Sequence, residues 1–248
     1  MRIAFLIFDD ITALDAIGPF EVLCRIPGAE VMFVGETAGI KRADPKSLGI
    51  VADYSIADVT NADILNSINM VEGVYEDELG ITFSVVFQHT WATADPYSGT
   101  GVDSLLRSVQ AYWNVNYPAA QNPRDTMHLW TGKSYALSQG YAFIDVICNH
   151  PESAYGLSGK LEWVPAKYEI TAHEIGHNLG AVHGEAADGC ADTLMNAQLT
   201  TSTPFVFCSV SIGQIQSHVS ASGGCLSSRN DAATRFDFDG DSKADIGL

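Results

Sequence analysis

The chain has 248 residues, of which 46% are hydrophobic and 10% aromatic, a composition typical of a globular protein with a real core in one large or two modest domains. Its 30 acidic and 13 basic residues give a formal net charge of −17 at pH 7. This charge excludes nucleic acid and anionic membrane surfaces as favoured partners, because both would repel the chain. No stretch has the length of a membrane-spanning helix, so we expect no membrane insertion.

The N-terminal segment alternates strand and helix patterns. Residues 3–8 (IAFLIF) predict a buried strand, and acidic residues follow where a signal peptide would have a small-residue cleavage site. Residues 12–24 predict a helix and residues 29–35 a second strand. This β–α–β order requires further strands to complete a sheet.

Residues 1–65 also resemble the opening of the PfpI-type family, which includes isonitrile hydratases. The resemblance rests on IAFLIFDDITALDAIGPFEVL, which contains Asp15, and on LGIVADYSIADV. It implies that Asp15 matches the acidic residue supporting a cysteine nucleophile, which in that family sits on a later strand-to-helix elbow. No such elbow follows, and Cys24 falls within the predicted helix. We therefore interpret the segment as a βαβ fragment.

From residue 62 the sequence pattern changes. Apolar residues recur at helical spacing at Ile64, Ile68, Val71, Tyr75 and Leu79. Gly80 follows as a C-terminal cap, and residues 81–88 predict a strand. A second helix is expected around residues 102–113, and residues 127–132 and 141–148 predict two further strands.

The sequence HEIGHNLGAVH carries the chemistry. On a helix, residues i and i+4 share one face, so His173 and His177 can reach one metal ion. Gly180 permits a turn that brings His183 in as a third imidazole, and three protein ligands leave one position open, as in catalytic zinc sites. Glu174 would then act as the general base that takes a proton from zinc-bound water. The alternative, core histidines without a metal, requires five fixed positions to coincide by chance.

This pattern resembles the metzincin zinc metalloproteases. Met195, in ADTLMNAQ, matches the turn whose methionine lies beneath the zinc ligands of that group. The resemblance covers residues 62–228 and is to the reprolysin or adamalysin branch, through INMVEGVYEDELGITF and FCSVSIGQIQSHVSASGGCL. It implies an α/β fold with a mixed, mostly parallel twisted sheet, a long active-site helix and a small, mostly irregular C-terminal subdomain.

The resemblance also implies the disulfides Cys148–Cys225 and Cys190–Cys208, which leave Cys24 unpaired. Such bonds form in an oxidising compartment, and the family is secreted, although no signal peptide is recognised in this chain.

A substrate-binding edge is implied for residues 140–148, with Gly140, Tyr141 and Ala142 at its start. An extended peptide would add to this strand through backbone hydrogen bonds. The alternative is an ordinary edge strand without a substrate. Four further histidines have no ligand spacing and are interpreted as packing or surface residues: His89, His128, His150 and His218.

Two features depart from the family pattern. Gly184 follows the third histidine, where related members often have Asp. The strand that normally precedes the first helix of the domain is also missing, and we hypothesise that residues 49–55 replace it.

The C-terminal tail, FDFDGDSKADIGL, resembles the start of an FG-GAP or VCBS-type repeat. Its acidic residues have the alternating spacing of a calcium loop: Asp237, Asp239, Asp241 and Asp245. A single copy lacks the neighbours that bury such repeats, so an unstructured acidic end is the competing interpretation.

The sequence thus predicts three parts: a PfpI-like fragment (1–65), a metzincin catalytic domain (62–228) and a calcium-loop repeat or disordered tail (229–248). The expected function is zinc-dependent hydrolysis of internal bonds in a peptide or protein substrate. The alternatives are a PfpI-like enzyme such as an isonitrile hydratase, or an inactive fusion that only binds zinc or calcium. The sequence does not predict the oligomeric state.

Overall fold

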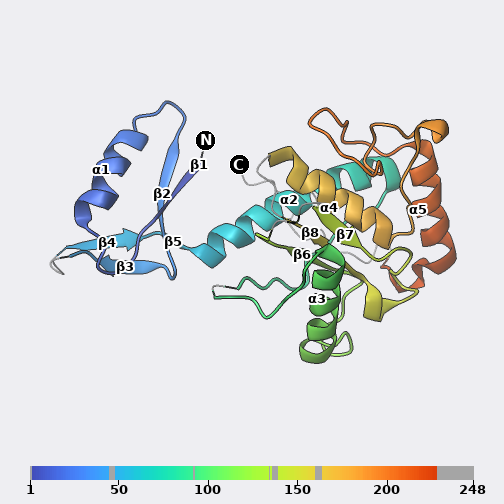
Figure 1. Ribbon diagram of the computed structural model, residues 1–248, viewed down its shortest axis with the longest axis horizontal. Coiled ribbons are helices and arrows are strands. Elements are labelled where there is room, and N and C mark those ends of the chain that lie inside the picture. The colour runs from blue at the N-terminus through green and yellow to red at the C-terminus, as the bar shows by residue number, and fades with distance from the viewer. Residues whose placement is uncertain are drawn as a thin grey trace. The chain divides into compact units, whose positions relative to one another are not determined.

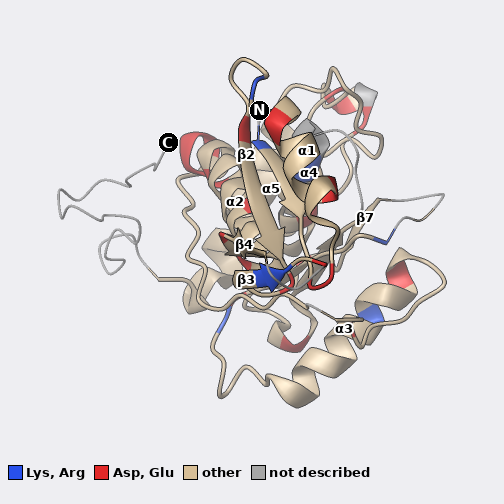
Figure 2. Ribbon diagram, turned by 90° about the vertical axis from the view of Figure 1, so that its left-hand side faces the viewer, with Lys and Arg blue, Asp and Glu red and all other residues tan. Residues whose placement is uncertain are grey.

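The computed structural model describes residues 2–44, 48–91, 93–133, 135, 139–159 and 164–227. The protein is mixed α/β and divides into two compact units, one of residues 1–66 with 88–95 and one of residues 67–87 with 96–248. The division falls inside helix α2 (Ile56–Leu79), and each unit is described by itself (Figure 1). Figure 2 marks acidic residues in red and basic residues in blue; the sequence has 30 of the first and 13 of the second.

The first unit contains the predicted β–α–β segment. Strand β1 (Arg2–Leu6), helix α1 (Ala13–Leu23) and strand β2 (Glu30–Gly35) follow in that order, and β1 pairs with β2 in parallel. The short strand β5 (Tyr54–Ser55) pairs with the other side of β2, which gives the order β1-β2-β5. The buried core of this unit is small: Ile7, Ile11, Ala16, Ala43, Ile50 and Ala52.

Residues 49–55 do not replace the missing strand of the catalytic domain, so that hypothesis is wrong. Strand β4 (Gly49–Ala52) pairs antiparallel with β3 (Gly39–Arg42), and β5 pairs with β2, both within the first unit. Local pairing wins because the loop between β3 and β4 is short and little entropy is lost in closing it. The alternation also fits, since Ile50 and Ala52 point into the core of the first unit.

The second unit is built on a small mixed sheet in the order β6-β8-β7. Strand β6 (Met127–Trp130) is parallel to β8 (Tyr155–Ser158), and β7 (Gly140–Ala142) is antiparallel to β8 and lies at the edge. Strand β8 was not predicted, because YGLS is only four residues long and contains Gly and Ser but no β-branched residue. It forms because it lies between two partners and is buried along its whole length.

Two strand predictions are corrected here. Residues 81–88 form no strand; instead Ile81 N–H donates to Tyr75 O and Phe83 N–H to Glu72 Oε1, which ties the segment to α2. The strand expected over residues 141–148 ends at Ala142. Phe143 N–H still bonds Tyr155 O of β8, but the N–H groups of Asp145, Val146 and Ile147 bond carbonyls at the end of the helix Val164–Asn178 instead.

Four described helices lie wholly or partly in the second unit. They are α2, α3 (Val102–Asn116), α4 (Val164–Asn178) and α5 (Ser209–Ser222). Helices α3 and α4 both pack against β7 and β8 (Figure 1). Gly80 has φ +68° directly after α2, as expected of a C-terminal cap. None of the described helices combines the length and apolar character of a membrane span.

The core of the second unit joins α2, α4, α5 and the segment between the last two. Its buried members are Val71, Val74, Tyr75, Ile147, Ala172, Ile175, Leu179, Ala181, Leu194, Met195, Phe207 and Ile215. Tyr75 is fully buried, and its hydroxyl donates to Ala172 O at 2.7 Å, which fixes α4 against α2. Disulfides join Cys148 to Cys225 and Cys190 to Cys208, the two pairs implied by the resemblance.

Candidate metal centre

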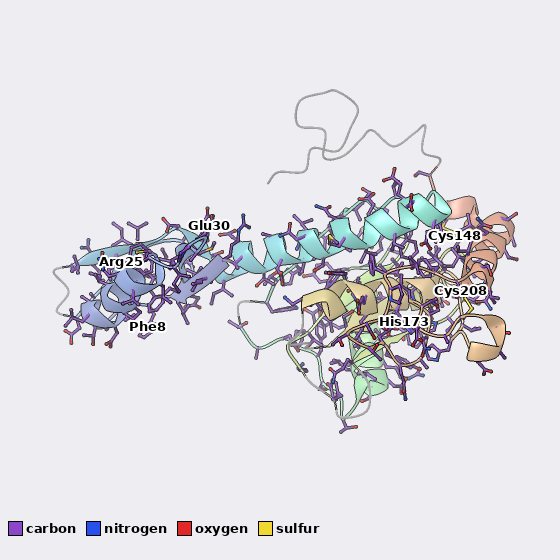
Figure 3. All side chains as sticks on the ribbon, turned by 90° about the horizontal axis from the view of Figure 1, so that it is seen from above. Phe8, Arg25, Glu30, Cys148, His173 and Cys208 are labelled. Carbon is purple, nitrogen blue, oxygen red and sulfur yellow. A yellow bond between two sulfur atoms is a disulfide. The ribbon has the colours of Figure 1, made fainter. Side chains whose placement is uncertain are left out.

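Three imidazoles converge beside helix α4. His173 lies on this helix (Figure 3). His177 lies one turn further along it, and Gly180, with φ +90°, turns the chain so that His183 faces them. The Nε2 atom of His183 lies 3.2 Å from the Nε2 atom of His173 and 3.2 Å from that of His177. One turn of helix and the chain reversal at Gly180 are therefore enough to bring the three rings together.

The other nitrogen of each helical histidine is bound to the backbone. His173 Nδ1 donates to Leu194 O at 2.6 Å, and His177 Nδ1 donates to Ala181 O at 2.7 Å. Because carbonyl oxygens only accept, both Nδ1 atoms carry the hydrogen and both Nε2 atoms present lone pairs. Lone pairs that face one another repel unless a cation lies between them.

The donor set fits zinc. Tetrahedral zinc with Zn–N bonds of about 2.0–2.1 Å places its ligand nitrogens about 3.3 Å apart, close to the observed spacing. Burial lowers the pKa of His173 to about 3 and that of His177 to about 4, and it also lowers the pKa of His183. The rings are thus neutral at pH 7, which is the form that binds a metal.

Glu174 lies next to the first ligand and is only 5% exposed. Its Oε2 atom is buried and has no hydrogen-bond partner, and burial raises the pKa of the carboxyl well above its ordinary value. The other oxygen, Oε1, approaches Gly140 so closely that a Cβ atom there would overlap it. Gly140 at the start of β7 therefore leaves the space that this carboxyl occupies.

Met195 lies directly under the metal-binding helix. It is fully buried, and a Cβ atom on Gly176 would lie 2.7 Å from its sulfur, so the glycine between the two helical ligands permits the contact. The residue before it, Leu194, supplies the carbonyl that orients His173, and Met195 O accepts a hydrogen bond from Gly184 N at 2.8 Å. The turn thus contacts the segments of the first and third ligands.

The structure gives a physical reason for Gly184. A Cβ atom at this position would lie 2.5 Å from the Cβ atom of Cys190, so the disulfide to Cys208 occupies the space that an Asp side chain would need. The link to the methionine turn is made by the backbone of Gly184 instead.

The remaining sequence candidates lie elsewhere. His128 bonds Ser158, the His89 ring lies against Trp91, and His150 lies near Glu152. Cys24 is exposed and free at the end of α1, so it is not on a strand-to-helix elbow. The four aspartates proposed as a calcium loop lie outside the described residues.

One residue that the sequence interpretation assigned to packing or the surface contacts the segment of the three histidines. His218 on α5 is 6% exposed and lies against Gly180. Ligand spacing could not reveal it, because it lies 35 residues after His183 and its ring nitrogens bond Asp145 and Ile147. The one available signal was its helical spacing with Gln214.

Residues 61–184 match the family model described as Metallo-peptidase family M12B Reprolysin-like. The match covers half of the chain and includes the three histidines and Glu174. The chain belongs to this metallopeptidase family. The convergent histidines described above therefore lie in a domain whose relatives are metallopeptidases, and family membership implies zinc as the metal.

Two curated relatives are similar to part of this chain. A zinc metalloproteinase-disintegrin-like protein of Cerberus rynchops is 23% identical over 163 residues, which is 64% of this chain and 26% of the relative. Disintegrin and metalloproteinase domain-containing protein 9 of Homo sapiens is 29% identical over 115 residues, 45% of this chain and 14% of the relative. The chain thus spans about a quarter or less of the length of these relatives.

Among solved structures, one titled as the structure of a chaperone-substrate complex is similar over 62% of this chain and 32% of its own, with 11% identity and a TM-score of 0.37. That score is too low to support a conclusion about the fold.

Proposed function

We propose that this protein is a zinc-dependent endopeptidase that hydrolyses internal bonds of a peptide or protein. The observation that carries the proposal is the convergence of three imidazoles beside a buried carboxyl, with Nε2 of His183 3.2 Å from Nε2 of each of the other two, in a chain of the reprolysin-like family. Zinc, when bound there, lowers the pKa of water and polarises the carbonyl of the scissile bond.

The residues of the site would have distinct roles in binding the metal and in proton transfer. His173, His177 and His183 hold the ion, and the carbonyls of Leu194 and Ala181 fix the orientation of the two helical rings. Glu174 takes a proton from the attacking water and later gives it to the leaving amine. Burial favours this role, since a carboxyl with a raised pKa is a stronger base.

The substrate would bind along β7. This strand lies at the edge of the described sheet, with β8 on one side, and such an edge is where an extended peptide can add through backbone hydrogen bonds. The space left by Gly140 places Glu174 beside the same edge. A peptide held there would have one of its carbonyls near both the carboxyl and the metal position.

We also propose an extracellular or otherwise oxidising location, which the two disulfides support. The PfpI-like alternative requires a cysteine on a strand-to-helix turn, whereas Cys24 follows a helix. Calcium binding by the tail and the resemblance of that tail to FG-GAP or VCBS-type repeats remain proposals.

A quenched fluorescent peptide library tests the proposal. The full chain should cleave peptides, and a zinc chelator should abolish the cleavage. Glu174→Gln keeps the shape of the side chain and should lower kcat by about 10²–10⁴-fold, with zinc still bound at one equivalent. Glu185→Gln is the matched control, since it makes the same chemical change at an exposed glutamate that is not next to the helical histidines. Cleavage that persists in the zinc-free protein, or undiminished in Glu174→Gln, would disprove the mechanism.

A further inference from the structure

The segment that carries the third ligand needs support from outside the metal-binding helix. Helix α4 ends at Asn178, and residues 181–183 belong to no helix or strand. His183 is also the most exposed of the three imidazoles. Its position therefore depends on whatever the preceding residues contact.

Helix α5 supplies two polar side chains to this segment. Gln214 and His218 lie four residues apart and so share one face of the helix. Gln214 Oε1 accepts a hydrogen bond from the N–H of Val182 at 3.1 Å. Val182 directly precedes His183, so this bond fixes the backbone one residue before the third ligand.

His218 fixes the turn at the start of the same segment. A Cβ atom on Gly180 would lie 3.2 Å from the Cβ atom of His218 and 3.4 Å from Cγ and Nδ1 of its ring. Gly180 also has φ +90°, a conformation that side chains other than glycine rarely adopt. The His218 ring therefore lies in close contact with the turn at Gly180 and limits where that turn can lie.

The His218 ring is itself held by hydrogen bonds. Its Nε2 donates to Ile147 O at 3.0 Å, and its Nδ1 is hydrogen-bonded with Asp145 Oδ1 at 2.5 Å. The backbone N–H of Asp145 in turn donates to His177 O at 3.0 Å, at the end of α4. One ring thus contacts both the loop that caps the second ligand and the turn that leads to the third.

We propose that Gln214 and His218 are positioning residues for the zinc centre, through which α5 sets the place of His183 relative to His177. The inference rests on the proposed function, and neither residue touches the ion or the substrate. Substitution of residues that orient metal ligands from behind lowers metal affinity by about 10–100-fold, which is the effect to be measured.

The experiment measures zinc affinity of the full chain by competition with a chromophoric chelator. Gln214→Ala removes the acceptor for Val182 N–H and should weaken zinc binding by about tenfold, with little change in the melting temperature of the zinc-free protein. Gln214→Glu retains an acceptor oxygen and should bind zinc at least as tightly as the native chain. Gln216→Ala, on the exposed side of α5, is the matched control and should be neutral.

His218→Phe keeps a ring against Gly180 but removes both hydrogen bonds, and should weaken zinc binding by up to about a hundredfold. If this variant does not fold, the Gln214 series alone decides the question. Peptide cleavage at saturating zinc should show kcat lowered more than KM raised, because β7 is unchanged.

The outcomes distinguish failure of the positioning role from failure of the proposed function. Native affinity in both Gln214→Ala and His218→Phe, or an equal loss in Gln216→Ala, overturns the positioning role while leaving the proposed function intact. His173→Ala is included throughout, since it removes a ligand. If that variant binds zinc like the native chain, the proposed function fails, and the positioning role fails with it.

Discussion

The two units of this chain differ in how completely they bury their apolar residues. Among its described residues the first has a core cluster of six, but eleven of its large hydrophobic side chains are exposed. They are Leu6, Phe8, Leu14, Ile17, Val22, Ile26, Ile40, Leu48, Val51, Tyr54 and Ile56. The second has a core cluster of twelve buried residues and two disulfides, and eight of its described large hydrophobic residues are exposed in a much longer stretch of chain.

The units also differ in their buried polar contacts. In the second, the fully buried Asn178 donates to Phe143 O and Tyr155 O and accepts from Thr126, so one side chain ties α4 to the sheet. The described metal-capable cluster lies in this unit as well. Parallel sheets such as that of the first unit are normally covered on both faces. The convergent histidines thus lie in the unit whose described core cluster is the larger.

The largest expected effect comes from zinc. At a free zinc concentration about a thousand times Kd, binding should raise the free energy of unfolding of the second unit by about 4 kcal/mol. The rise should vanish in His177→Ala and persist in His150→Ala, an exposed histidine. Denaturation with and without zinc measures it, and amide exchange in residues 2–44 should not respond. A zinc response in that segment would break the distinction between the units.

The disulfide between Cys148 and Cys225 closes a sequence separation of 77 residues. Replacing both residues with Ser should lower the free energy of unfolding by about 4 kcal/mol, because the unfolded chain gains freedom. Cys24→Ser changes a free, exposed thiol in the first unit and should be neutral. Urea denaturation compares the two. A loss below about 1 kcal/mol for the double variant would contradict this account.

Gly140→Ala should cost up to about 3 kcal/mol of stability and lower kcat, since the new Cβ atom overlaps the Glu174 carboxyl and approaches Ile170. Gly73→Ala is the matched control in the same unit. Its new Cβ atom would meet nothing within 4 Å, because Gly73 is at an exposed position of α2. The substitution should stabilise the protein by about 0.5–1 kcal/mol. Melting temperatures and peptide cleavage report both effects. Full activity in Gly140→Ala would show that the close approach is not required.

His128 should make the second unit sensitive to acid. Its Nδ1 is buried without a partner, its Nε2 bonds Ser158 at 2.8 Å, and burial lowers its pKa to about 3. The unfolded chain takes up a proton near pH 6.5 but the folded chain does not, so stability is full above that pH and falls below it. Between pH 7 and pH 5 the loss should reach about 2 kcal/mol, and His128→Gln should abolish that part of it.

Denaturation curves across this range give the comparison, with His150→Gln as the exposed control, because it should keep the slope of the native chain. An unchanged slope in His128→Gln would mean that the ring takes up its proton in the folded state.

The smallest effect is expected in the first unit. Leu14 is 76% exposed on α1, so Leu14→Ser should change the free energy of unfolding by no more than about 0.5 kcal/mol. Leu105→Ala, at a fully buried position in the second unit, should cost about 2–5 kcal/mol. Chemical denaturation distinguishes them. A loss above 1 kcal/mol at Leu14 would mean that this face is covered in solution.

The sequence by itself determined the elements that depend on local spacing. Helices α1, α2 and α3 and the break at Gly180 follow from local pattern and one glycine, since helical contacts join residues three and four apart. The segment of α5 was matched only through the family resemblance. The approach of His173 to His177 follows from helical spacing, and the turn at Gly180 adds His183. The disulfide pairs came from the resemblance to a family rather than from the residues themselves.

Only the tertiary structure decided what depends on distant partners. Strand β8 exists because two neighbours bury it, residues 81–88 are not a strand because α2 takes their hydrogen bonds, and residues 49–55 pair within the first unit. The contacts of Gln214 and His218 with the third-ligand segment join residues that no local pattern relates. Strand pairing and polar support are set by the fold, and so the sequence predicted which three histidines converge but not what holds them in place.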